Sequence, residues 1–131
     1  MESFRFQPYS WLGMENHKLV LLEHLNHFGD LFGGYMLMWV DEIAGIAASL
    51  DYPGYRFVTV GMDRVAFHQR APEGAILRIA TEQVHVGTTS VRYTVRVWWA
   101  HQPGENPGPV FSTTVAMVRV NERGEKTPLS T

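Results

Sequence analysis

Residues 32–50 read FGGYMLMWVDEIAGIAASL and decide the fold, because they hold the one long helical pattern of the chain. Their apolar positions recur in alternating steps of four and three residues, which is the stripe of an amphipathic helix; these positions are Met36, Val40, Ile43, Ala47 and Leu50. Residues 51–54, Asp-Tyr-Pro-Gly, end the pattern, because proline cannot continue the hydrogen-bond ladder of a helix. The sequence therefore predicts a helix over residues 32–50, roughly 27 Å long at about 1.5 Å per residue.

After this helix the chain changes to an alternation of apolar and polar residues with a period of two, which is the pattern of β-strands. Four strands are expected, over residues 56–69, 75–86, 89–100 and 109–121. Because the connections are short and rich in turn-forming residues, we expect successive strands to be antiparallel neighbours. A further short strand is expected before the helix, over residues 17–24.

This order of elements predicts an α+β fold in which a long antiparallel sheet of about five strands wraps around one central helix. A chain of 131 residues has the length of one domain, expected here over residues 1–131, with residues 1–13 and 122–131 as terminal extensions. Exposed sheet edges and the remaining aromatic residues indicate self-association.

Composition excludes several classes of protein. The absence of cysteine excludes disulfide scaffolds and thiolate-zinc sites. Eleven Lys and Arg residues stand against thirteen Asp and Glu residues, and the arginines are scattered, so no nucleic-acid partner is expected. The six histidines form no zinc motif, so no metal is expected. Without a signal-peptide pattern or a run long enough to span a membrane, a cytoplasmic location is expected.

The stretch NHFGDLFGGYMLMWVDEIAG, residues 26–45, holds the residues that point to chemistry. Gly33 and Gly34 lie where the helix begins, although glycine is more common after a helix ends. A ligand or backbone close to the free amides would explain them, since such amides can polarise a carbonyl, and a tight turn would explain them equally. Asp41 lies in mid-helix with no Lys or Arg three or four residues away, which indicates a pocket or a partner.

The spacing of these residues resembles the entrance to the central helix of hotdog-fold acyl-CoA thioesterases, in the acyl-CoA hydrolase (YciA-like) branch. The shared pattern is Asn26, two residues, Gly-Asp, two residues, Gly-Gly, six residues and Asp41. Phe32, the segment Val58-Thr59-Val60 with Phe67, and the turn over residues 86–91 are also similar. The resemblance covers roughly residues 19–120 and leaves the two terminal extensions outside it.

The resemblance implies a hotdog fold that hydrolyses an acyl-CoA, with coenzyme A as part of the substrate and product and no separate cofactor. It implies a homodimer at minimum, with a tetramer or a hexamer as larger alternatives, and a sheet extended across the dimer. Asp41 would act as a general base on water, or as a nucleophile. Asn26 and the amides of Gly33 and Gly34 of one subunit would face Asp41 of the other.

Two further segments are candidates for binding coenzyme A. The backbone of Thr59, Val60 and Gly61 offers a track for the pantetheine arm, because glycine lets a ligand approach a strand closely, although Gly61 also fits a bulge. The resemblance places coenzyme A near a turn whose amides and hydroxyls suit phosphate, and an ordinary hairpin explains this turn equally. The residues of the turn are Gly87, Thr88, Thr89 and Ser90.

Two other functions remain open for a chain of this pattern. A hotdog hydratase or dehydratase would need a histidine paired with an acid on the helix, and residues 32–50 contain no histidine. A non-catalytic acyl-CoA-binding or regulatory module would keep the pocket and the dimer without turnover. The presence of both Asn26 and Asp41 favours the hydrolase over this module.

Overall fold

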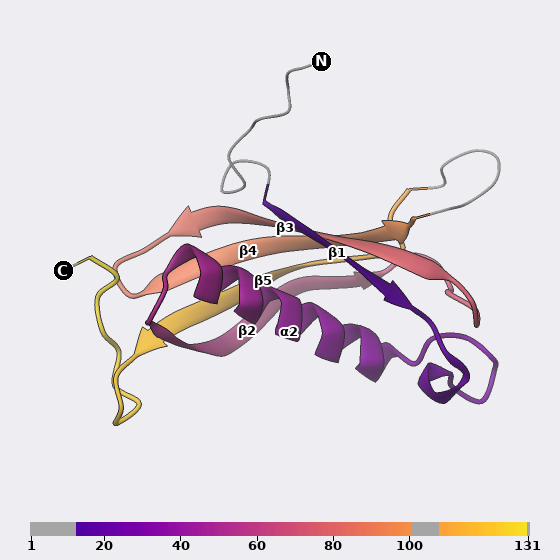
Figure 1. Ribbon diagram of the computed structural model, residues 1–131, viewed down its shortest axis with the longest axis horizontal. Coiled ribbons are helices and arrows are strands. Elements are labelled where there is room, and N and C mark those ends of the chain that lie inside the picture. The colour runs from indigo at the N-terminus through magenta and orange to yellow at the C-terminus, as the bar shows by residue number, and fades with distance from the viewer. Residues whose placement is uncertain (1–12, 101–107, 131) are drawn as a thin grey trace, which may run out of the picture.

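The computed structural model describes residues 13–100 and 108–130 and contains one long helix lying along one face of a curved antiparallel sheet (Figure 1). The helix is α2 (Gly33–Asp51). The strands are β1 (Met14–Leu19), β2 (Arg56–Phe67), β3 (Ile76–Val86), β4 (Ser90–Trp99) and β5 (Phe111–Val120), and a short 3-10 turn, η1 (Leu22–His24), follows β1. The five strands are arranged in the order β1-β3-β4-β5-β2, which confirms the predicted α+β class.

Helix α2 agrees with the prediction to within one residue at each end. Four of the five predicted stripe positions are buried against the sheet, whereas Leu50, at the end of the helix, is 66% exposed. The buried surface of α2 is wider than the predicted stripe, because the concave sheet also covers the flanks of the helix. Trp39, Ala44 and Ala48 complete that surface.

The prediction of the first strand was wrong in its bounds. Residues 14–19 form the strand in place of residues 17–24, and its last residue, Leu19, pairs with Ile76, the first residue of β3. Leu22–His24 instead form η1, in which the Leu21 amide donates a hydrogen bond to His24 Nδ1 at 2.9 Å. The strand is set by its pairing with β3, which lies far away in sequence, so the local alternation could not locate it.

The expectation that all successive strands are neighbours was also wrong for β2 and β3. Strand β2 pairs with β5 at one edge of the sheet, whereas β3 lies between β1 and β4. The connection over residues 68–75 crosses three strand spacings, about 14 Å, and eight residues of extended chain span more than that. This crossover leaves β2 at the edge beside α2, where the candidate site lies.

The core lies between α2 and the concave face of the sheet. Alternate residues of β3 and β4 point into it, and the side chains with the least exposure include Leu77, Ile79, Val91, Val95, Val97, Phe111 and Val115. The opposite face carries ion pairs, such as Arg92 Nη1 with Asp63 Oδ2 at 2.8 Å. One face of the sheet is therefore covered by the single helix and the other is polar.

Tyr93 connects the core to the end of α2, and its ionisation makes the stability of the fold fall at alkaline pH. Its side chain is buried, and its hydroxyl donates a hydrogen bond to Asp51 Oδ2 at 2.8 Å. Burial, followed by this bond to a carboxylate, raises the pKa of Tyr93 above its ordinary value of 10.0. The folded chain therefore keeps a proton that the unfolded chain releases, so the stabilisation is complete below about pH 10 and is lost as the pH rises above it.

We expect urea unfolding between pH 8 and pH 11 to show a steeper loss of stability for the wild-type protein than for Tyr93→Phe. The variant removes the titrating hydroxyl and keeps the ring, so it should be less stable by about 1.5–3 kcal/mol at pH 8, with a smaller difference at pH 11. Parallel pH profiles would contradict the assignment.

Candidate active site

Asp41 lies on α2 at the side of the helix that faces β2. Its Oδ1 atom accepts a hydrogen bond from Thr59 Oγ1 at 2.6 Å, which is the short length expected when the acceptor is a carboxylate. Asp41 is half-buried and Thr59 is exposed. Among the described residues no other side chain donates to this carboxylate, so Oδ2 is available to a water molecule or a substrate.

Strand β2 is irregular beside this pair. Thr59 pairs with Met117 and Gly61 pairs with Ala116, so Val60 is the extra residue of a β-bulge and its side chain is 60% exposed. This observation favours the interpretation of Gly61 as part of a bulge. A Cβ atom built on Gly61 meets nothing within 4 Å, so open space lies next to the strand at this point.

Asn26 organises the loop before the helix. Its Oδ1 atom accepts hydrogen bonds from the amides of Phe28 at 2.9 Å and Asp30 at 3.2 Å. These two donors identify the oxygen of the side-chain amide, so the Nδ2 group points away from the turn. Within the part of the chain that the structure describes, Nδ2 donates to no other residue, which leaves a fixed donor available to a ligand.

Gly33 and Gly34 begin α2 with amides that have no acceptor among the described residues. Neither glycine has a positive φ, so a turn that requires the left-handed conformation does not explain them. Aromatic rings explain them instead, because a Cβ atom would lie 3.2 Å from the Phe67 ring at Gly33 and 2.6 Å from the Phe32 ring at Gly34. The two free amides lie at the positive end of the helix dipole, where they can stabilise an anion.

The structure brings some of the predicted site residues together and keeps others apart. Asn26 lines a cavity of about 240 Å³ at the beginning of α2, and Asp41 is not among the residues lining it. Gly33 and Asp41 are eight residues apart, which is about 12 Å along a helix. One chain therefore has the carboxylate in the middle of the helix and the donors at its beginning.

The turn of Gly87, Thr88, Thr89 and Ser90 is a hairpin held by the C-terminal segment. The Gly87 amide donates to the Ser90 carbonyl at 2.8 Å, and the Thr88 carbonyl accepts from the Leu129 amide at 2.9 Å. Ser90 pairs with Val118, which pairs with Val58 of β2. The end of the turn is therefore two strand spacings, about 10 Å, from the strand that carries Thr59.

The hydroxyl of Thr59 is the contact that sequence reasoning missed. The sequence suggested only a role for the backbone of Thr59, because the residue is 18 positions from Asp41 and lies on another element. No local pattern signals such a pair. It depends on the packing of β2 against α2.

Within residues 13–100 and 108–130, no three His, Cys, Asp or Glu side chains are placed to hold a metal ion. Over these ranges, no helix has the length and apolar character needed to cross a membrane.

Comparison with known proteins assigns this arrangement to a family. The model of the Thioesterase superfamily matches residues 28–103, which is more than half of the chain. The chain belongs to the thioesterase superfamily. This thioesterase is 29% identical over 107 residues to the acyl-CoA thioester hydrolase YciA of Salmonella typhimurium, covering 79% of the chain and 80% of the relative.

Two solved structures agree with this assignment. A hexameric hotdog fold thioesterase of Campylobacter jejuni is 30% identical, with a TM-score of 0.76 and 88% of each chain covered. An apo-hexameric acyl-CoA thioesterase is 33% identical, with a TM-score of 0.79, and the match covers 88% of this chain and 73% of the other. The thioesterase therefore has the expected hotdog fold, and it is a thioester hydrolase.

Proposed function

We propose that this thioesterase hydrolyses acyl-CoA thioesters to a free carboxylic acid and coenzyme A. The observation that carries the proposal is the Asp41 carboxylate, held by Thr59 at 2.6 Å beside the bulged edge strand. The names of similar proteins support the substrate class, because they include an acyl-CoA thioester hydrolase and an acyl-CoA thioesterase.

In this proposal Asp41 is the general base. Its Oδ2 atom takes a proton from a water molecule, whose oxygen attacks the thioester carbonyl carbon. The carbon–sulfur bond then breaks, and the departing thiolate takes from Asp41 the proton that Asp41 removed from water, which forms coenzyme A and restores the carboxylate. A base of this kind contributes about 10²- to 10⁴-fold to the rate. The alternative is that Asp41 acts as a nucleophile. Its carboxylate then attacks the thioester carbonyl carbon and displaces the thiolate, and water hydrolyses the resulting anhydride.

The oxyanion formed during the attack needs donors that one chain does not place beside its own Asp41. The amides of Gly33 and Gly34 and the Nδ2 group of Asn26 are free donors, and loss of one such donor typically costs about 10²- to 10³-fold in rate. Because Gly33 and Asp41 are about 12 Å apart along α2, we propose that a second subunit supplies them.

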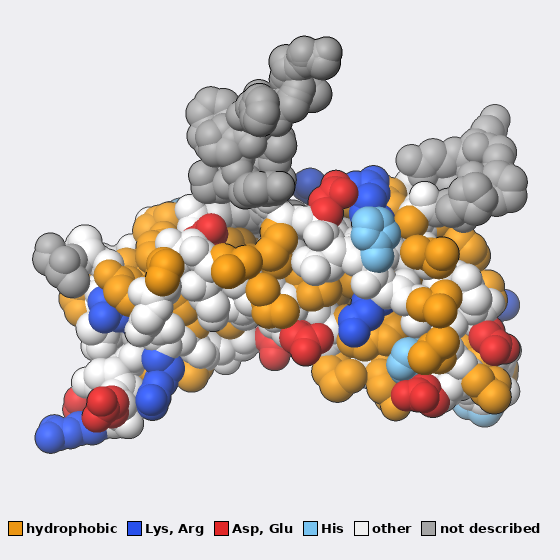
Figure 2. All heavy atoms as spheres, viewed as in Figure 1, with side chains coloured by type: hydrophobic (Ala, Val, Ile, Leu, Met, Phe, Trp, Pro, Cys, Tyr) orange, Lys and Arg blue, Asp and Glu red, His pale blue; other side chains and the backbone are white. Residues whose placement is uncertain are grey.

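The surface beside the site supports a homodimer at minimum. On β2, Val58 is 43% exposed and Val60 is 60% exposed, and on α2, Met38 is 54% exposed and Ile46 is 44% exposed. Figure 2 shows that hydrophobic side chains are widespread on the face that carries α2. Pairing of two β2 edges would extend the sheet across the dimer and cover these residues. The similar hotdog fold thioesterase of Campylobacter jejuni is a hexamer.

Coenzyme A would lie along the edge strand. The open space next to Gly61 supports a path for the pantetheine arm along the backbone of Thr59, Val60 and Gly61. The turn at residues 87–90 remains the candidate for the nucleotide phosphates, because the hydroxyls of Thr88 and Thr89 have no hydrogen-bond partner among the described residues. No separate cofactor takes part in this reaction.

The test is thiol release by the purified protein from short, medium, long and aromatic acyl-CoAs. Because the chain contains no cysteine, every thiol detected comes from coenzyme A. We expect turnover with at least one of these substrates. Saturable binding of acyl-CoA without turnover would instead identify a binding module, and hydration of an enoyl-CoA without thiol release would identify a hydratase.

A further inference from the structure

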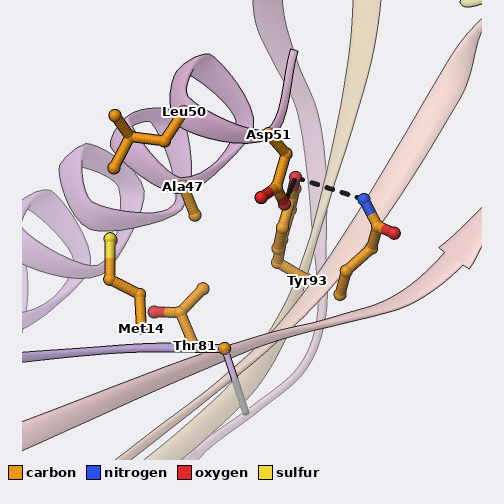
Figure 3. Close-up of a pocket in the computed structure, with 8 residues that line it drawn as sticks. Met14, Ala47, Leu50, Asp51, Thr81 and Tyr93 are labelled. Atoms are coloured by element: carbon orange, nitrogen blue, oxygen red, sulfur yellow. Dashed lines mark hydrogen bonds between the residues drawn. The ribbon is translucent and has the colours of Figure 1, made fainter. Parts of the chain in front are cut away.

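A second cavity, of about 380 Å³, lies between the C-terminal half of α2 and strands β1, β3 and β4 (Figure 3). It is distinct from the candidate active site, because neither Asp41 nor Thr59 lines it. Ala47 lines it from α2 and is six residues after Asp41, so the two side chains point about 120° apart around the helix. The cavity therefore faces the β1 side of the sheet, whereas Asp41 faces β2.

The walls of this cavity are mostly apolar and one end of it is polar. Figure 3 shows Met14 and Thr81 on the sheet side and Ala47 and Leu50 on the helix side of the hollow. At that end, Tyr93 donates to Asp51 at 2.8 Å, and Gln83 Nε2 donates to the Tyr93 hydroxyl at 3.4 Å. The side chains of these three residues are therefore hydrogen-bonded to one another.

Thr81 is the exception among the polar groups of the cavity. Its side chain is 2% exposed, and its Oγ1 atom is buried without a hydrogen-bond partner among the described residues. A buried hydroxyl without a partner is costly, and most such groups in proteins bond to the protein, to water or to a ligand. Asn16, on the same face of β1 as Met14, also has a buried Nδ2 group without a partner.

We propose that this cavity binds a small, neutral, mainly aliphatic molecule that carries one hydroxyl or amide group. The apolar walls take the aliphatic part, and the polar group pairs with Thr81 Oγ1. The Asp51 carboxylate, which lines the polar end, disfavours an anion, so the carboxylic acid released in the proposed reaction is not the expected ligand. A volume of about 380 Å³ lies within the range of small-molecule pockets, about 300–1,000 Å³.

The probe for this site is 1-octanol, titrated into the full chain with ¹³C-labelled methionine methyl groups and followed by NMR. We expect saturable shifts and intermolecular NOEs at the methyl group of Met14, and an affinity at least tenfold higher than that of octanoate. Thr81→Val, which keeps the shape and removes the hydroxyl, should weaken octanol binding about five- to tenfold. Thr81→Ser keeps the hydroxyl and should bind nearly as the wild type does. Ala47→Phe, which fills the cavity, should abolish binding.

Three results would each overturn the proposal. The first is the absence of saturable NOEs between octanol and Met14 in the wild-type protein. The second is equal octanol affinity in Thr81→Val, which lacks the hydroxyl, and Thr81→Ser, which keeps it. The third is a set of NOEs from Met14 to aromatic protons of residues 1–12 that octanol does not displace, because the chain itself would then fill the cavity.

Discussion

Replacement of Asp41 by asparagine is expected to lower kcat/KM for acyl-CoA hydrolysis by about 10²- to 10⁴-fold, the contribution of a general base. Asparagine has nearly the same shape, and its Oδ1 atom can still accept the hydrogen bond that Thr59 donates at 2.6 Å. The side-chain amide cannot take a proton from water. The variant should therefore keep its fold and its subunit assembly and lose most of its hydrolytic activity.

This result is measured by thiol release at matched protein concentration, together with urea unfolding and size-exclusion chromatography. Glu42→Gln is the matched control, because it removes the neighbouring carboxylate on the same helix, and Glu42 is exposed. We expect the control to retain wild-type kinetics. Full activity of the Asp41→Asn variant would show that Asp41 takes no part in the reaction.

Mixing Asp41→Asn subunits with Asn26→Ala subunits is expected to restore activity to about one quarter of the wild-type value after complete exchange in a two-fold symmetric dimer. Each variant alone should be impaired, with a loss of about 10²-fold for Asn26→Ala if it removes one donor to the oxyanion. In a mixed dimer, one of the two sites combines the intact Asn26 of one subunit with the intact Asp41 of the other. Half of the dimers are mixed, and half of their sites are intact.

The experiment needs proof that subunits exchange, which co-purification of differently tagged chains supplies. Two preparations of Asp41→Asn mixed in the same way are the control and should show no gain. If both residues act within one chain, the mixture shows only the mean of the two parent activities. That outcome would disprove a site shared between subunits and would leave the role of Asp41 untouched.

The elements that follow from local chemistry were predicted well. The periodicity of residues 32–50, with Pro53 just beyond them, predicted α2 to within one residue. Strand pairing depends on distant residues, so β1 was placed too late in the chain and β2 was placed next to β3 in error. A short connection indicates antiparallel strands, but it does not state how many strands it crosses.

The candidate site was predictable only where its residues lie close together in the sequence. Asn26 and Asp41 belong to one short stretch with a recognisable spacing, so the sequence identified them together. The hydroxyl of Thr59 reaches Asp41 only through the packing of β2 on α2. Gly33 and Gly34 were interpreted as a sign of a ligand or backbone close to their amides, or of a tight turn, but the groups that a Cβ atom would meet are the rings of Phe67 and Phe32.

The edge strand β2 has a consequence for how the protein must be made. It lies at the end of the sheet with Val58, Val60, Val65 and Phe67 all more than 40% exposed, and although it has a bulge at Val60, it contains neither lysine nor proline, two of the residues that protect an edge from unwanted pairing. A newly synthesised chain that has not yet assembled with a second subunit is therefore prone to aggregate. The yield of active protein should rise with slow synthesis at low temperature, where assembly keeps pace with translation.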